Sequence, residues 1–160
     1  MRPARPADAP TISRTMTLGF ETYRAFAPAG WSPRPPRGAV ERIAEQLRNR
    51  HTWALLADIA GEPAGHVALF PDPARADAVC LWQLFVRPPW WGTGLARTLH
   101  DAFVAEARER GYTAGRLSTP AAHARARRFY EGCGWRPSGP PHELWDFGIP
   151  VIEYRRALDR

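Results

Sequence analysis

The chain has 160 residues, the length of one ordinary domain, and its composition of 44% hydrophobic and 24% charged residues provides apolar material for a core. All 22 basic residues are arginines and the formal net charge is +6, so Schiff-base chemistry and the phosphate-binding lysine of a P-loop are excluded. The two cysteines, Cys80 and Cys133, form no CxxC and have no histidine at ligand spacing, so we expect neither a disulfide framework nor a metal site.

The first third of the chain is predicted to contain an edge strand and two helices. Residues 1–7 are too rich in proline for anything but a short edge strand. Apolar residues at helical spacing predict a helix over residues 8–26, with an aspartate as its N-cap. Residues 27–38 form a proline-rich loop that carries Trp31, and a second helix is predicted over residues 39–49.

Three strands are predicted next. Residues 52–60 and 64–70 read as a hairpin joined by the tight turn Gly61-Glu62. A polar loop over residues 71–77 follows. Residues 79–86 form the most apolar strand of the chain, so we expect this strand to be central in the sheet and buried on both faces.

The last part of the chain is predicted to alternate helices and strands. The expected elements are a helix over 94–110, a strand over 113–119, a helix over 121–130, a short strand over 135–136 and a final strand over 149–156, with a loop over 137–148. We find no repeat and no domain linker. This order predicts a single mixed α/β or α+β domain over residues 1–160, built on one central sheet.

One stretch carries a ligand-binding pattern. Residues 91–96 (Trp-Gly-Thr-Gly-Leu-Ala) join the central strand to a helix, and the small residues at 92, 94 and 96 let a phosphate approach backbone N–H groups at the positive end of the helix dipole. An ordinary strand–helix turn is the structural alternative. A dinucleotide fingerprint would need a glycine where Arg97 stands, and a P-loop would need a lysine.

A second segment, His123 to Trp135, ends a helix with Phe129-Tyr130 and leaves it through glycines. Together the two segments resemble the GCN-five-related N-acetyltransferase (GNAT) superfamily. Its Gln/Arg-x-x-Gly-x-Gly/Ala motif aligns with residues 91–96. Its Asn-x-x-Ala-x-x-Phe-Tyr-x-x-x-Gly-Phe motif aligns with His123, Ala126, Phe129, Tyr130, Gly134 and Trp135. Two positions depart from the pattern: Trp91 replaces Gln or Arg, and His123 replaces Asn.

The resemblance implies a fold and an activity. The implied GNAT fold has a central mixed sheet of six to seven strands flanked by about four helices. The implied activity is an N-acetyltransferase that moves an acetyl group from acetyl-CoA to a primary amine by direct transfer in a ternary complex. We expect a small-molecule amine as acceptor, with a protein N-terminal or side-chain amine as the first alternative and a non-catalytic acyl-CoA-binding sensor as the second. A homodimer is common in the family and is expected on that ground.

The resemblance also assigns site residues. Tyr130 is implied to be the general acid that protonates the leaving thiolate. The main chain of Leu84, Phe85 and Val86 is implied to bind the pantetheine arm, and an N–H of Phe85 or Val86 to polarise the acetyl carbonyl. The pyrophosphate is implied to bind the amides of Trp91, Gly92, Thr93, Gly94, Leu95 and Ala96. His123 and Arg127 are weaker candidates for cofactor contacts.

The acceptor side is less defined by sequence. Trp31, Glu143 and His66 are predicted to bind the acceptor, although a structural or solvated role suits each of them as well. The general base stays open between His142, Glu143, His66 and Glu21. Four tryptophans could line the acceptor pocket or belong to the core: Trp31, Trp53, Trp82 and Trp145.

Partners and location are expected from charge and hydropathy. The arginines alternate with acids on predicted helices, a pattern typical of solvated helix faces, so we expect no nucleic-acid partner. The chain shows no apolar leader and no apolar run of membrane-spanning length, so we expect a cytoplasmic protein with no membrane partner and no resident metal.

Overall fold

The computed structural model describes residues 1–33, 37–144 and 147–158. Its helices and strands follow the order predicted from the sequence. The helices are α1 (Ala9–Glu21), α2 (Ala39–Arg48), α3 (Leu95–Glu109) and α4 (Ala124–Gly132), with short 3-10 turns η1 (Pro6–Asp8), η2 (Thr22–Ala25) and η3 (Pro88–Trp90). The strands are β1 (Arg2–Pro3), β2 (Trp53–Ile59), β3 (Glu62–Pro71), β4 (Ala78–Val86), β5 (Ala114–Pro120), β6 (Arg136–Pro137) and β7 (Val151–Ala157).

The starts of two helices differ from the prediction, one in its cap and one in its position. Asp8 does not cap α1 with its side chain; its carboxylate accepts hydrogen bonds from the guanidinium of Arg2 at 2.7 and 2.8 Å and from the Arg5 N–H at 2.7 Å, which ties β1 to the start of α1. The helix predicted from residue 121 begins at Ala124 instead. The N–H of Ala121 donates to Pro150 and that of His123 donates to Pro120, so these residues form a turn before α4.

The strands form one mixed sheet in the order β1-β2-β3-β4-β5-β7-β6. All neighbouring strands are antiparallel except β4 and β5, which are parallel and are connected through α3. Crossing from β4 to a parallel neighbour requires such a connection, because the chain must return to the same end of the sheet. The sheet is therefore made of two consecutive parts of the chain, β1–β4 and β5–β7, which meet at one seam.

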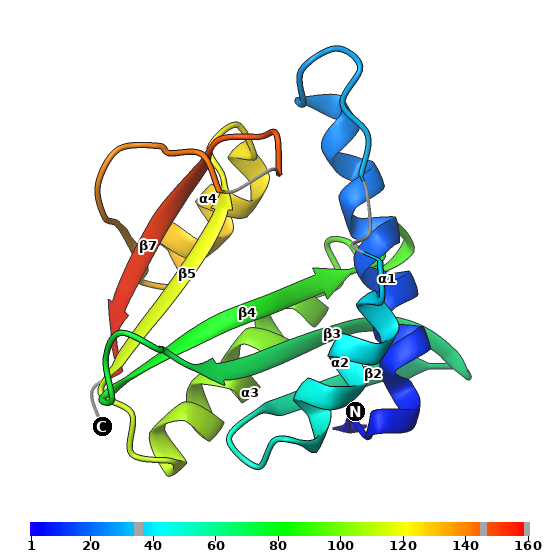
Figure 1. Ribbon diagram of the computed structural model, residues 1–160, viewed down its shortest axis with the longest axis vertical. Helices are drawn as coiled ribbons and strands as arrows, with labels where there is room; N and C mark the ends of the chain where they lie inside the picture. The colour runs from blue at the N-terminus through cyan, green and yellow to red at the C-terminus, as the bar shows by residue number, and fades with distance from the viewer. Residues whose placement is uncertain (34–36, 145–146, 159–160) are drawn as a thin grey trace.

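The seam is short. β4 and β5 pair through Ala78–Cys80 and Ala114–Arg116, and within the described strands they pair nowhere else. Figure 1 shows the two strands close together at the lower left and diverging toward the top. In β4, Leu81 pairs with Leu69 and Gln83 with Ala68, so Trp82 is an extra residue without a partner in β3. Such a bulge bends the strand that carries it, which directs the far half of β4 away from β5.

Helices cover the sheet on both faces. Side chains of α3 and α4 pack in one apolar cluster around Leu99, Phe103 and Trp135, and those of α1 and α2 pack in a second cluster around Ile12, Ile43 and Leu56. Figure 1 shows α3 crossing behind β3 and β4. None of the helices in the described part of the chain combines the length and the hydropathy of a membrane span.

The expectation that the central strand is buried on both faces is only half confirmed. Ala78 to Leu81 are buried, as predicted. Trp82 is 40% exposed, and Leu84 to Val86 are half-buried. The reason is the separation of the strands: beyond the seam, β4 loses its neighbour on one side. Its apolar residues there form the wall of a cavity.

Candidate active site

A cavity of about 370 Å³ lies where β4 and β5 separate. Its walls come from the far half of β4, the turn before α3, one side of α4 and the end of α1 with η2. The lining residues are Gly19, Thr22, Tyr23, Leu84, Phe85, Val86, Trp90, Trp91, Gly92, Gly94, Ala96, Arg97, Thr119, His123, Arg125, Ala126, Phe129 and Tyr130. Nine of the twelve predicted catalytic and cofactor-binding residues are in this set; Thr93 and Leu95 belong to the same turn, and Arg127 is elsewhere.

The edge of β4 presents unpaired backbone groups to the cavity. The Arg87 N–H donates to the Ala64 carbonyl at 2.9 Å, and His66 pairs with Phe85 in the register of β3 and β4. Hydrogen-bonded and non-hydrogen-bonded pairs alternate along an antiparallel ladder, so the N–H and C=O of Phe85 face β3, whereas those of Leu84 and Val86 face the side that β5 has left. An extended ligand can therefore pair with the N–H and C=O of Leu84 and with the N–H of Val86, whereas the Val86 carbonyl already accepts the Trp91 indole N–H. Of the two donors considered for the acetyl carbonyl, Val86 has its N–H on the cavity side and Phe85 does not.

The turn before α3 has the geometry of an anion site. Gly92 and Gly94 have φ values of 80° and 88°, a left-handed conformation that favours glycine. A Cβ built at either position would meet no atom within 4 Å, so the space above the turn is open. The 15-residue helix α3 begins at Leu95 and adds the positive end of its dipole. The N–H groups of residues 92–96 have no backbone acceptor among the described residues, no atom lies above Gly92 or Gly94, and a strand edge is next to them, so the site fits the phosphates of an acyl-CoA. The predicted amide of Trp91 is the exception, because it donates to the Pro88 carbonyl at 3.0 Å.

Trp91 turns its indole into the site. The indole N–H donates to the Val86 carbonyl at 2.7 Å, which holds the ring beside the edge of β4. The Arg125 guanidinium carbon lies 4.0 Å from the centre of the Trp91 ring, a cation–π contact between α4 and the turn. Arg125 is a lining residue that the sequence analysis missed. Its spacing of four from Phe129 puts it on the cavity side of α4, and this spacing was the available signal.

Tyr130 lines the cavity from α4. It is 8% exposed and packs against the rings of Phe129, Trp135 and Tyr154. Its hydroxyl makes no hydrogen bond to a described residue and is not sealed from the cavity. Burial, and then the nearby Tyr23 and Cys133, raise the pKa of Tyr130 above its usual value, so the phenol is protonated at neutral pH. Chemically, it can donate a hydrogen bond or a proton to an atom in the cavity.

His123 lines the same cavity at the start of α4. Its ring lies 5.3 Å from that of Tyr23 and 4.9 Å from that of Phe26, measured between centroids. Burial, followed by the positive charge of Arg125, lowers the pKa of His123. The imidazole is therefore neutral near pH 7 and can accept a hydrogen bond.

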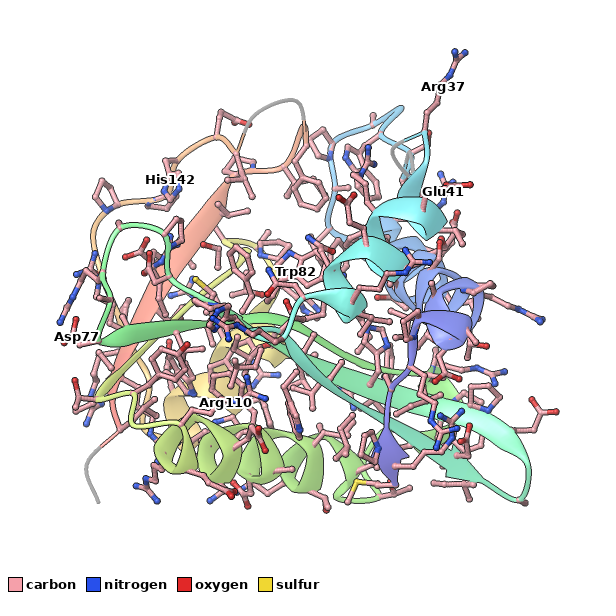
Figure 2. All side chains as sticks on the ribbon, turned by 60° about the horizontal axis from the view of Figure 1, so that its bottom comes forward. Arg37, Glu41, Asp77, Trp82, Arg110 and His142 are labelled. Carbon is pink, nitrogen blue, oxygen red and sulfur yellow. The ribbon has the colours of Figure 1, made fainter. Side chains whose placement is uncertain are left out.

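Three predicted residues lie away from the cavity lining. Arg127 donates from Nε to the Tyr154 hydroxyl and from Nη1 to the Ala121 carbonyl, both at 3.1 Å. His66 is fully buried and its Nε2 lies 2.9 Å from Gln83 Oε1. Glu143 is exposed and follows His142, which is labelled in Figure 2 and pairs with Val151 at the start of β7.

Among the remaining candidates for the acceptor side, one lies next to the cavity and the other described ones do not line it. Trp31 is half-buried next to the cavity: its ring stacks on Tyr23, and its indole N–H donates to the Phe147 carbonyl at 2.9 Å. Glu21 is exposed and pairs with Arg24. Trp53 and Trp82 do not line the cavity, and Trp145 lies outside the described residues. Within the described ranges, no group of three or more His, Cys, Asp or Glu could hold a metal ion.

Comparison with known proteins identifies the family. The family model described as "Acetyltransferase (GNAT) family" matches residues 19–135, which include both the glycine turn and Tyr130. The chain therefore belongs to the GNAT acetyltransferase family, and this membership implies acetyl-CoA as the co-substrate. The resemblance and the fold predicted from the two sequence motifs are confirmed.

Solved structures show the same fold. A GNAT-family structure from Desulfovibrio desulfuricans is 24% identical, with a TM-score of 0.78 over 99% of this chain and 98% of that chain. The ribosomal-protein-alanine N-acetyltransferase of Brucella melitensis is 19% identical, with a TM-score of 0.75 over 98% of both chains. Nourseothricin acetyltransferase is 21% identical, with a TM-score of 0.63 over 69% of this chain and 67% of that chain. No curated protein matches this chain significantly.

Proposed function

We propose that this chain is an N-acetyltransferase that moves an acetyl group from acetyl-CoA directly to the primary amine of a small molecule, in a ternary complex. The observation that supports this most is that a single cavity is lined by the glycine turn, the free edge of β4 and Tyr130. The turn offers N–H groups for phosphates, the strand edge offers an extended path, and the phenol stands beside that path. Each is a part that acetyl transfer from a thioester requires.

The protein groups have separate tasks in this proposal. The acyl-CoA supplies an activated acetyl group as a thioester. The N–H of Leu84 or Val86 faces the cavity and can stabilise negative charge on the acetyl oxygen. As the C–N bond forms and the C–S bond breaks, Tyr130 donates a proton to the departing sulfur. The amine loses its proton to water or to the neutral imidazole of His123, since the described lining residues include no carboxylate, and Tyr130 regains its proton from solvent.

The acceptor side favours a compact amine with an apolar body. The loop that carries Trp31 and the segment that carries Phe147 meet over the η2 end of the cavity, with ring centroids 6.1 Å apart. Tyr23 and Phe26 add further aromatic surface there. An aromatic entrance that is bridged on one side suits a small molecule better than an extended peptide. The relative from Brucella melitensis, named for a ribosomal-protein alanine, keeps an N-terminal amine among the acceptors to be tested.

Tyr130→Phe tests the proposed chemistry. We expect the variant to bind acetyl-CoA like the parent protein and to lose about 100-fold or more in turnover, because it removes one positioned acid and little packing volume. The measurement is release of free thiol from acetyl-CoA with a panel of small amines and an alanyl peptide. Tyr112→Phe, a half-buried tyrosine outside the cavity, is the matched control.

The outcomes separate the alternatives. Unchanged turnover in Tyr130→Phe would remove the general-acid role. Stabilisation by acetyl-CoA without acetylation of any amine would favour the sensor alternative. Acetylation of the alanyl peptide in preference to the small amines would favour the protein acceptor. If acetyl-CoA does not raise the melting temperature at all, the central proposal is wrong.

A further inference from the structure

Two side chains that line the cavity from different elements are in contact with each other. Trp91 comes from the turn before α3 and Arg125 from the first turn of α4, and the guanidinium carbon lies 4.0 Å from the centre of the indole ring. The indole is itself fixed by its hydrogen bond to the Val86 carbonyl, at 2.7 Å. The two contacts link α4, the turn and the edge of β4 in series. The link therefore lies next to both regions proposed to bind the cofactor, the N–H groups of the turn and the edge of β4.

Two arginines line the cavity, Arg97 and Arg125, and they differ in whether an acidic side chain is near. The Nε of Arg97 lies 3.2 Å from Asp101 and its Nη1 lies 3.4 Å from Cys133 Sγ. Arg125 has no carboxylate within salt-bridge distance among the described residues, and its side chain is exposed. Arg125 is thus the lining cation whose charge is not already balanced by an acidic partner in that part of the chain.

The chemistry of a stacked guanidinium leaves its donors available. When a guanidinium stacks on an aromatic ring, the face of the guanidinium contacts the ring, whereas its N–H donors lie in the guanidinium plane and point outward. These donors match two phosphate oxygens at once, which an ammonium group does not. Trp91 therefore holds Arg125 in position without consuming its hydrogen bonds.

We propose that Trp91 and Arg125 form a clamp over the phosphates of the acetyl-CoA co-substrate, in which Arg125 binds the phosphates and Trp91 positions Arg125. The inference rests on the proposed function. It explains why Trp91 can stand where the motif has a glutamine or arginine. The positive charge comes from another wall of the cavity, on α4, and the indole provides the surface that holds it there.

The test is a binding measurement that does not depend on turnover. Calorimetry gives the Kd of acetyl-CoA, and protein NMR titration gives that of S-acetylpantetheine, which has the arm but no phosphate. For Arg125→Ala we expect acetyl-CoA affinity to fall about 10- to 100-fold, the value of one or two charge-assisted hydrogen bonds, with S-acetylpantetheine affinity unchanged. The loss should shrink as salt is raised, because the interaction is ionic.

Three further variants separate charge, stacking and helix effects. Arg128→Ala removes the same charge from an exposed position on α4 outside the cavity and should leave both affinities unchanged. Arg125→Lys keeps the charge without the planar stack and should lie between the parent and Arg125→Ala. Trp91→Ala should weaken acetyl-CoA binding, and adding Arg125→Ala to it should cost less than it does in the parent protein.

The outcomes distinguish this proposal from the proposed function. Parent-like affinity of Arg125→Ala for acetyl-CoA overturns the clamp and leaves the acetyltransferase intact. An equal loss for S-acetylpantetheine overturns it too, because the residue would then act on the shape of the cavity rather than on phosphate. A parent protein with no affinity for acetyl-CoA overturns both.

Discussion

Gly19 shows how closely one residue controls the cavity wall. A Cβ built at this position would lie 2.1 Å from Phe85 Cδ1 and 2.5 Å from Cε1. The Phe85 ring is held by Phe20 and His66, with centroid separations of 5.3 and 5.7 Å, so it has little freedom to move aside. The absence of a side chain in α1 therefore lets an aromatic ring of β4 occupy that space.

Gly19→Ala should consequently destabilise the fold, although alanine is the better helix former. We expect a loss of about 1–3 kcal/mol in the free energy of unfolding, measured by urea denaturation, because one added methyl group displaces the Phe85 ring. Gly132→Ala is the control: nothing lies within 4 Å of a Cβ at that position, so this variant should be as stable as the parent or slightly more so. Equal stability of the two variants would contradict the packing argument.

At the scale of elements, two loops from the two halves of the sheet are tied together. The loop after η2 and the segment before β7 are joined by the hydrogen bond from Trp31 Nε1 to the Phe147 carbonyl, across 116 positions of sequence. Gly148 keeps this contact tight, since a Cβ there would lie 3.3 Å from Trp31 Cδ1. This tie forms one side of the entrance proposed for the acceptor.

Trp31→Phe keeps an aromatic ring and removes the donor. We expect faster amide hydrogen exchange in residues 28–33 and 147–150 and a raised KM for the acceptor, because the loops lose the bond that joins them. The affinity for acetyl-CoA should be unchanged. Trp53→Phe at the start of β2 is the control, since its indole makes no hydrogen bond to the described residues. Slower or unchanged amide exchange in these residues of Trp31→Phe would contradict the proposed role of the Trp31–Phe147 hydrogen bond.

Local patterns predicted the elements and much of the site, and long-range geometry decided the rest. The glycine turn and Tyr130 could be predicted because each depends on a few adjacent residues. The separation of β4 from β5 could not, because it follows from one extra residue, Trp82, in a continuous apolar strand. The spacing of four from Phe129 could have placed Arg125 on the cavity side of α4, but its contact with the Trp91 indole depends on how α4 packs against the turn, which no spacing within either motif specifies.

At the scale of the whole molecule, buried histidines link stability to pH. His66 is fully buried, and burial lowers its pKa to about 4, although the Gln83 hydrogen bond acts in the opposite direction. The unfolded chain takes up a proton near pH 6.5 but the folded chain does not until about pH 4. The stabilising contribution is therefore complete above pH 6.5 and is lost as the pH falls toward 4. Burial also lowers the pKa of His100, which acts in the same direction.

His66→Gln should flatten this dependence. Protonation of His66 should cost the parent protein about 3 kcal/mol of unfolding free energy between pH 6.5 and pH 4. Most of this loss should be absent in the variant. Urea denaturation at intervals across this range measures the difference between the two profiles. His142→Gln, which replaces an exposed imidazole, is the matched control. Parallel profiles for the parent and His66→Gln would show that His66 is not the group responsible.

The short seam between β4 and β5 also gives the molecule a mechanical property. We expect the two halves of the sheet to rotate relative to each other about Ala78–Cys80, which would serve as the pivot, and the groups proposed to act on one substrate, Val86 and Tyr130, belong to different halves. At a rise of about 3.3 Å per residue, β4 extends about 20 Å from Cys80 to Val86, so a rotation of about 3° at the pivot moves its tip by about 1 Å. Displacements of about 1 Å can change catalytic rates about 100-fold. Substitutions at the pivot, far from any reacting atom, can therefore tune the activity through the angle between the halves.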